Sequence, residues 1–96
     1  MELFIFARFH ARAGIEAAVE AVLREQTARV REEPGCLAIQ AYRSIRDPRL
    51  FYIHSRWTDE AAFEIHADLA RTVEFIKRME TLIDHPFEAA RVRPLA

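Results

Sequence analysis

Several residue types are scarce in this chain of 96 residues, and each shortage excludes a class of protein. Cys36 is the single cysteine, which excludes an internal disulfide and fits a reducing compartment, so we expect a cytoplasmic protein. Gly14 and Gly35 are the two glycines, too few for a glycine-rich phosphate loop, which disfavours nucleotide cofactors. No apolar run approaches the roughly 20 residues that span a bilayer, so we expect no membrane partner.

The chain also lacks an excess of charge of either sign. It has 14 Lys and Arg against 15 Asp and Glu, and the basic residues are scattered among the acidic ones. A nucleic-acid-binding surface needs a basic stripe, so we expect no nucleic-acid partner. Apolar residues, in contrast, are abundant at 51%. This content supports one hydrophobic core, and the length is too short for two, so we expect a single domain over residues 1–96.

Hydrophobic periodicity predicts an alternation of strands and helices. Segments in which apolar residues alternate are typical of strands, and segments with apolar positions three or four apart are typical of helices. The predicted order is a strand over residues 3–9, a helix of about 19 residues from Ile15 to the Pro34-Gly35 turn, strands over residues 36–45 and 50–57 joined by a turn at 46–49, a helical stretch over 59–83 with a break near Asp68, and a strand over 87–92.

This βαββαβ order predicts the α+β class, with a ferredoxin-like four-stranded antiparallel sheet and the helices on one face. The first strand places Ile5 and Phe9 on one face and Phe4 and Phe6 on the other, so both faces are apolar there. We therefore expect a homodimer in which sheet packs on sheet, a dimeric α/β barrel-like assembly. The alternative is that Phe4 and Phe6 form a modest exposed patch.

Several short motifs occur in a characteristic order. A Glu-Pro-Gly turn precedes the second strand, an Asp-Pro turn joins the hairpin, and a Trp-Thr-Asp-Glu run connects the third strand to the next helix. Together they resemble the antibiotic biosynthesis monooxygenase family, and its quinol-monooxygenase-like members in particular, over nearly the whole chain. The resemblance is carried by residues 31–37, 43–48, 51–52 and 56–63, together with His66 and Phe75.

The resemblance implies a small dimeric ferredoxin-like protein, but several activities. Members act as cofactor-free oxygenases of phenols, quinols or polyketide anthrones, as haem-degrading enzymes, or as isomerases of small phosphorylated sugars. Two positions depart from the family pattern: Ser55 stands where a Glu is common, and Ala70-Arg71 replaces a Pro-His pair. The second helical stretch has no histidine after His66 until His85, and the first strand has no Asn, so haem degradation is not expected.

His66 is the predicted catalytic residue. Helical spacing places it on a stripe with Ala62, Leu69, Val73 and Ile76, so its ring should point at the sheet. An imidazole changes protonation near neutral pH and can act as a general base. The alternative is a packed histidine with one hydrogen bond.

Four further residues are predicted to bind substrate: Trp57, Phe63, Ser55 and Arg71. Trp57 offers an aromatic wall and an indole N–H, with Phe63 in the same run of sequence. Alternation along the third strand places the Ser55 hydroxyl on the face of Trp57. Arg71 can pair with an anion but cannot act as a base. A core role for Trp57 and an exposed position for Arg71 remain open alternatives.

No metal or cofactor is predicted. His10, His54, His66 and His85 show no ligand-type spacing, such as a pair four residues apart on a helix. Cys36 follows a turn and has no catalytic signature, so we expect it to be a buried small hydrophobe.

The leading hypothesis is a cofactor-independent monooxygenase that uses molecular oxygen on a small phenolic, quinol or enolic substrate. Such a substrate supplies its own electrons, so one base, a few donors and a dry cavity suffice. Two alternatives stay open. One is a non-catalytic dimeric small-molecule-binding or stress-related module, and the other is an isomerase of a small phosphorylated ketone, with His66 moving the proton and Arg71 holding the phosphate.

Overall fold

The computed structural model describes all 96 residues and contains four strands and three helices. In chain order these are β1 (Leu3–His10), α1 (Glu16–Val30), β2 (Cys36–Arg43), β3 (Leu50–Trp57), α2 (Glu60–Asp68), α3 (Ala70–Glu80) and β4 (Glu88–Val92).

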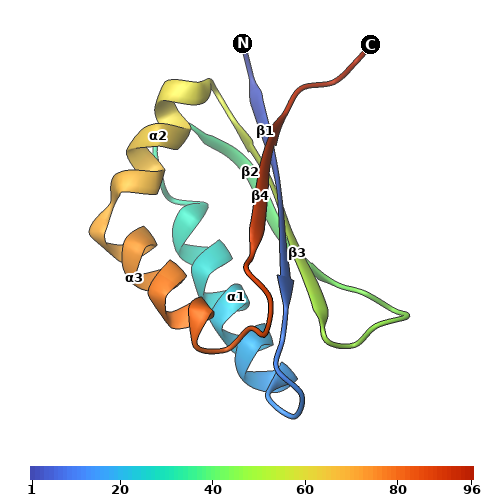
Figure 1. The fold of residues 1–96 in the computed structure, drawn as a ribbon. Coiled ribbons are helices and arrows are strands. Elements are labelled where there is room, and N and C mark those ends of the chain that lie inside the picture. The colour runs from blue at the N-terminus through green and yellow to red at the C-terminus, as the bar shows by residue number, and fades with distance from the viewer.

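The four strands form one antiparallel sheet in the order β2-β3-β1-β4. All three helices lie on one face of this sheet, and both chain termini lie near the same end of it (Figure 1). This is the predicted ferredoxin-like α+β fold. In the β1–β3 register Leu3 pairs with Trp57 and His10 pairs with Leu50, so Trp57 and His10 lie at opposite ends of the sheet.

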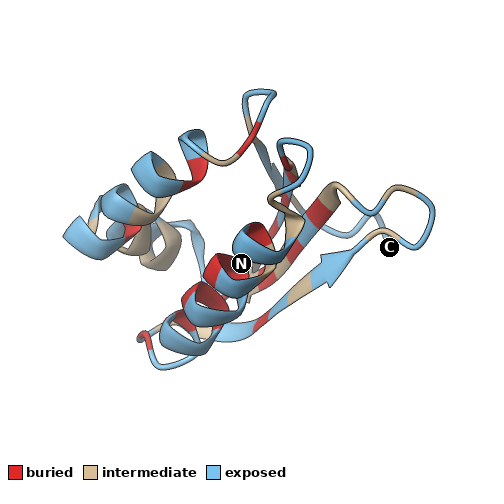
Figure 2. Ribbon diagram, turned by 90° about the horizontal axis from the view of Figure 1, so that it is seen from below, coloured by how far each residue is buried: buried red, intermediate tan, exposed pale blue.

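The core lies between the sheet and the helices, where the buried parts of the ribbon face one another (Figure 2). The predicted alternation is confirmed in both central strands. Ile5 and Phe9 of β1 are buried against the helices together with Phe51 and Trp57 of β3, whereas Phe6 on the opposite face is 52% exposed. Branched and aromatic side chains at every second position therefore hold the helical layer on the sheet.

The first helix is shorter than predicted, because it ends at Val30 instead of continuing to Pro34. The backbone N–H groups of Glu32 and Glu33 bond to the carbonyls of Arg29 and Val30 at 3.1 and 3.0 Å, which makes tight turns in place of helix. Proline disfavours helical backbone in the residue before it, so the chain leaves the helix ahead of Pro34. As a consequence Glu33 lies in a turn next to α2.

The second strand also ends earlier than predicted, at Arg43. The Ser44 hydroxyl accepts the backbone N–H groups of Arg46 and Asp47 at 3.2 and 3.0 Å, which starts the hairpin turn at that point. Short hydroxyl side chains commonly compete in this way with strand pairing.

The expected break in the second helical stretch is confirmed and falls at Leu69, whose backbone is extended. The inward stripe predicted across this break is wrong at Val73, which is exposed, whereas Ile76 is partly buried as predicted. Thr72 and Met79 are the buried residues of α3. One extended residue lies between α2 and α3, so helical spacing counted from His66 does not hold at every position of α3.

The face of the sheet away from the helices carries apolar side chains in the open. Phe6 and Tyr42 are 52% and 53% exposed, and the rings of Phe4 and Phe6 lie 6.0 and 4.9 Å from the His54 ring. This aromatic open face is the surface that the sequence predicts to be covered by a second copy. None of the three helices has the length and apolar character needed to cross a bilayer.

Candidate active site

A mostly apolar cavity of about 210 Å³ lies between the sheet, α2 and α3. Hydrophobic side chains make up 13 of its 17 lining residues, with aromatic groups from several elements. Four of the lining residues are polar: Gln26, Ser55, His66 and Thr72. A dry cavity with few polar groups orients a small molecule through those groups and excludes competing water.

His66 comes from the last turn of α2, and its side chain is 11% exposed. Asp59 caps the start of this helix by accepting the Ala62 N–H at 2.8 Å, which fixes the helix on the end of β3. The imidazole lies 4.8 Å from the Trp57 ring and 5.5 Å from the Phe63 ring, measured between centroids. The ring therefore points toward the sheet, as predicted, within an aromatic surround.

Glu33 is the partner of His66. Its side chain is 3% exposed, and its Oε1 lies 2.7 Å from His66 Nδ1. The turn that carries Glu33 contains Gly35 at a φ of +87°, and a Cβ on Gly35 would come within 2.6 Å of the Ala62 Cβ on α2. The missing side chain at Gly35 thus lets the turn approach α2 closely enough for Glu33 to reach the imidazole.

The hydrogen bond to Glu33 determines which ring nitrogen of His66 can react. Because a carboxylate oxygen accepts hydrogen bonds, this contact assigns the hydrogen to Nδ1 and leaves Nε2 as the nitrogen with a free lone pair. Nε2 makes no hydrogen bond within the protein, and the ring lines the cavity. A carboxylate behind an imidazole also stabilises the imidazolium that forms when the base takes a proton.

Ser55 and Trp57 lie together in the cavity wall on the buried face of β3. The Trp57 indole N–H donates to Ser55 Oγ at 3.0 Å, and both side chains are buried. The indole N–H is therefore engaged within the protein, and what remains to face a ligand is the aromatic surface of Trp57. The Ser55 oxygen lies at the cavity, where a second hydrogen bond to a ligand is open to it.

The predicted ligand Arg71 lies outside this cavity. Its Nη2 is 3.1 Å from Glu33 Oε2, whereas His66 contacts the other oxygen, Oε1. The guanidinium therefore pairs with the buried carboxylate at the oxygen that His66 does not use. The guanidinium is 46% exposed and lies in an open groove between α1 and α3. Arg71 thus supports the Glu33–His66 pair, and the geometry does not bring it to the cavity as a contact for a bound anion.

Aromatic residues close the remaining walls. Phe63 meets the Trp57 ring edge-on at 5.6 Å, and the Arg91 guanidinium lies 5.2 Å over the outer side of the Phe63 ring. Phe75 of α3 meets Phe9 of β1 edge-on at 6.1 Å. These contacts hold Phe63 and Phe75, both predicted from the sequence to belong to the site's motifs, against the cavity.

The other candidate residues lie elsewhere. His54 is on the open face of the sheet, and His10 and His85 lie at the opposite end of the molecule from Trp57. Cys36 is half-buried and does not line the cavity. Burial raises the pKa of the Cys36 thiol, and the negative charge of Glu33 raises it further. Its thiolate is thus suppressed, as for a residue that packs and does not react.

Glu33 was not predicted as a site residue, although it lies in the motif at residues 31–37. The signal available was a carboxylate immediately before a Pro-Gly turn that leads into a strand of the core sheet. Glu33 and His66 are 33 positions apart in the sequence, so their contact depends on how α2 folds back over that turn.

Comparison with known proteins places these features in context. A family model described as antibiotic biosynthesis monooxygenase matches residues 3–78. No match is found among curated proteins.

Solved structures match over nearly the whole chain. The Pseudomonas aeruginosa protein PA3566 is 30% identical with a TM-score of 0.89, and the match covers 99% of this chain and 95% of that one. Rv0793 from Mycobacterium tuberculosis is 22% identical with a TM-score of 0.91, covering 100% and 97%. SnoaB, a cofactor-independent oxygenase from Streptomyces nogalater, is 19% identical with a TM-score of 0.88, covering 99% and 94%.

Proposed function

The chain belongs to the antibiotic biosynthesis monooxygenase family, and we propose that it is a cofactor-independent monooxygenase of a small phenolic, quinol or enolic compound. The observation that carries this proposal is the Glu33–His66 pair, with an Nδ1 to Oε1 distance of 2.7 Å, at the wall of an apolar cavity. The pair supplies an oriented base beside a mostly apolar cavity, which is what oxygenation without a metal or flavin requires of a protein.

For a phenol the reaction begins at His66 Nε2, which takes the hydroxyl proton. The phenolate carries the negative charge into the ring and gives electrons to molecular oxygen, and a carbon–oxygen bond forms at the ring carbon opposite the hydroxyl. Loss of the hydrogen on that carbon and cleavage of the O–O bond release water. One oxygen atom stays as the second carbonyl of a quinone, so phenol and oxygen give quinone and water.

The residues of the cavity wall and the residues behind His66 have different roles in this scheme. Trp57, Phe63 and Phe75 hold the ring of the substrate, and the Ser55 oxygen is placed to bond to a substrate hydroxyl. Glu33 keeps Nδ1 protonated and stabilises the imidazolium, which returns its proton when water leaves. Arg71 pairs with the Glu33 carboxylate in its buried position, so the carboxylate has a partner of opposite charge.

The cavity volume narrows the substrate class. An apolar cavity of about 150 Å³ accommodates one benzene ring, and this one measures about 210 Å³. We therefore propose a single-ring substrate with small substituents. A fused three-ring compound would require α3 to move away from the sheet.

The experiment is oxygen consumption by the purified protein, treated with chelator and given no flavin, with a panel of single-ring phenols and hydroquinones. We expect a substrate-dependent rate in the wild type and a loss of about 10²–10⁴-fold in His66→Gln. His54→Gln is the matched control, because it alters a histidine on the open face and should retain the wild-type rate. A rate at background for the whole panel, or an unchanged rate in His66→Gln, would count against the proposal.

The same panel separates the alternatives. Ligands that raise the melting temperature of the wild type without any oxygen uptake or product would support the non-catalytic binding module. The isomerase receives less support, because Arg71, its proposed phosphate contact, already pairs with Glu33 at 3.1 Å and does not line the cavity.

We also propose that the protein is a homodimer with the open faces of two sheets in contact. Support comes from the exposed Phe6, Tyr42 and Tyr52, which lie together on this face of the sheet. Sedimentation equilibrium should give twice the chain mass of 11.2 kDa, and Phe6→Glu should shift the mass toward that of one chain. A mass of one chain at micromolar concentration would overturn this assembly.

A further inference from the structure

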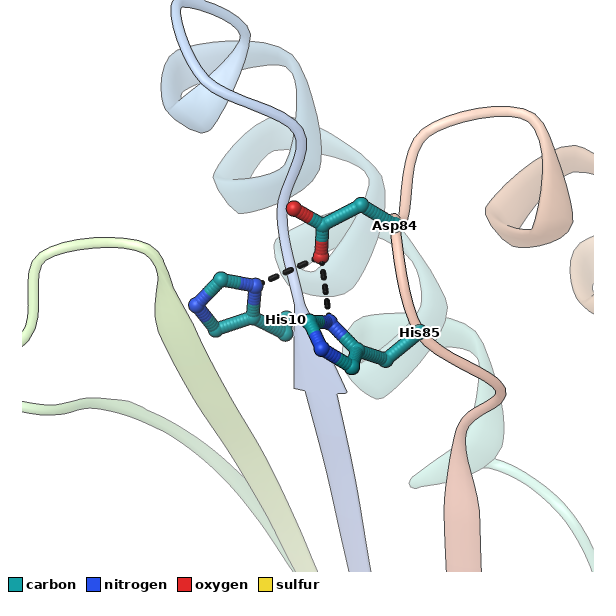
Figure 3. A group of neighbouring side chains, drawn as sticks. All are labelled: His10, Asp84 and His85. Carbon is teal, nitrogen blue, oxygen red and sulfur yellow. Dashed lines mark hydrogen bonds and ion pairs between the residues drawn. The ribbon is translucent and has the colours of Figure 1, made fainter.

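A second group of histidines lies at the other end of the sheet from the cavity. His10 closes β1, whereas Asp84 and His85 lie in the connection between α3 and β4. Figure 3 shows both imidazoles directed at the same oxygen of the Asp84 carboxylate. His10 Nδ1 is 2.6 Å from Oδ1 and His85 Nδ1 is 2.7 Å from it. We name these three residues the His10 cluster.

We propose that the His10 cluster is a binding site for a divalent transition metal ion, and that Zn²⁺ is the ion that it binds. One ligand atom from each of the three residues can be chosen so that all lie within 4.8 Å of one another. Two imidazole nitrogens and one carboxylate oxygen are a ligand set that suits Zn²⁺ and similar ions, and the fourth position is left for water or a small anion.

The backbone around the His10 cluster is held by hydrogen bonds from three segments of chain. The Asp84 N–H donates to the His10 carbonyl at 3.1 Å, and the Ala11 N–H donates to the Arg49 carbonyl at 2.7 Å. Ala11 also forms an isolated bridge with Ile83. The ligand atoms are therefore brought together by the fold itself and need only small side-chain shifts to open around an ion.

Side chains next to the His10 cluster provide the outer contacts that metal sites use. Asp47 Oδ2 lies 3.4 Å from His10 Nε2, on the ring nitrogen that would not bind the metal. A carboxylate in this position orients a metal-binding imidazole and raises its basicity. Arg49 pairs with Asp84 Oδ2 and holds the carboxylate so that Oδ1 faces the two rings. On metal binding each imidazole is the neutral tautomer whose hydrogen is on Nε2, so the hydrogen on Nδ1 is lost to solvent and Nε2 carries the one that remains or takes one from solvent.

The burial of the three residues permits an ion to enter from water. The His10 side chain is 23% exposed, Asp84 is 26% exposed and His85 is 68% exposed. His85 is therefore the ligand that can swing to admit the ion, and His10 and Asp84 form the fixed side. This site is separate from the cavity at His66 and does not depend on the proposed oxygenase activity.

Calorimetric titration of the protein, prepared without a polyhistidine tag, with Zn²⁺ tests the proposal. We expect one ion per chain in the wild type. Because loss of an outer partner already costs roughly 10–100-fold in metal affinity, His85→Ala should weaken binding by more than about 100-fold, and Asp47→Asn by about tenfold. His85 is mostly exposed, so its removal should leave the fold intact, which the far-ultraviolet circular dichroism spectrum checks.

His54→Ala is the matched control and should bind Zn²⁺ as the wild type does. A second measurement uses Co²⁺, which gives strong visible absorption in a four-coordinate protein site and weak absorption in water. That absorption should appear in the wild type and in His54→Ala, and be absent from His85→Ala. No Zn²⁺ binding by the wild type, equal binding by His85→Ala, or an equal loss in His54→Ala would each overturn the assignment.

Discussion

The two ends of the sheet carry the same chemical groups in different settings. At one end Glu33 and His66 pair inside an apolar layer, with exposed fractions of 3% and 11%. At the other end Asp84 meets His10 and His85 at the surface, with Arg49 alongside. A single imidazole that is backed by a buried carboxylate and lines a mostly apolar cavity has one ring nitrogen without a protein partner, which suits proton transfer. Two imidazoles that share one oxygen within reach of water suit a metal ion instead.

Burial, and not residue type, distinguishes the two groups of histidines and is the basis of the two roles proposed for them. The same difference in burial predicts how each group contributes to stability. Glu33 accepts from His66 and pairs with Arg71 where water cannot replace it, whereas Asp84 is open to solvent, which can take over its contacts.

The largest effect is expected at the buried carboxylate. Glu33→Ala removes the partner of the His66 N–H and should lower the free energy of unfolding by about 3 kcal/mol, because a buried donor is left unsatisfied and a cavity opens. Asp84→Ala, which alters the solvent-exposed group, should lower the free energy of unfolding by distinctly less. Urea unfolding of both variants in chelator measures the difference. Equal losses would remove the distinction between the two ends.

The two glycines extend the comparison to the backbone. Both have a φ of +87°, but a Cβ on Gly35 would lie 2.6 Å from the Ala62 Cβ, whereas a Cβ on Gly14 would meet nothing within 4 Å. Gly35→Ala should therefore destabilise the protein by about 2 kcal/mol more than Gly14→Ala, since overpacking adds to a backbone cost that both share. Thermal unfolding of the pair measures this. A larger loss for Gly14→Ala would show that α2 does not depend on the close approach at Gly35.

The smallest effect is expected at Cys36, whose thiol pKa depends on the buried charge of Glu33. Burial raises the thiol pKa, and Glu33 raises it further. The thiolate is the reactive form, so alkylation by iodoacetamide should be slower than for an unhindered thiol at neutral pH and should rise only at higher pH. Glu33→Gln removes the second cause and should speed alkylation a few-fold. An unchanged pH profile in Glu33→Gln would indicate that the Glu33 charge does not reach Cys36.

Much of the fold follows from local patterns in the sequence. Alternation in β1 and β3 predicted which face of each strand is buried, and Trp57 and Ser55 lie on the predicted face. The end of the first helix was harder to predict, because Pro34 acts on the residues before it and α1 already ends at Val30. The break near Asp68 was predicted, but the inward face of the helix after it depends on the extended backbone of Leu69, which local spacing does not report.

The site was predicted in part for the same reason. His66, Trp57 and Phe63 lie in one run of sequence, so their joint position at the cavity could be expected. Glu33 comes from a turn far along the chain, and His10 and Asp84 are 74 residues apart. Contacts between residues so far apart in the sequence depend on the order of strands in the sheet and on how the connecting segments run between the elements. Residue spacing does not contain that information.

The extended backbone of Leu69 has a consequence for how the cavity could be altered. It divides the cover of the cavity into two pieces, one of which carries the base and the other the residues that limit its size, Phe75 and Ile76. Substitutions of Phe75 and Ile76 would therefore change the shape of the cavity without touching the helix that carries His66. In the proposed enzyme, new substrates could be admitted at these two positions while Arg71 and Thr72 of the same helix are kept beside the Glu33–His66 pair.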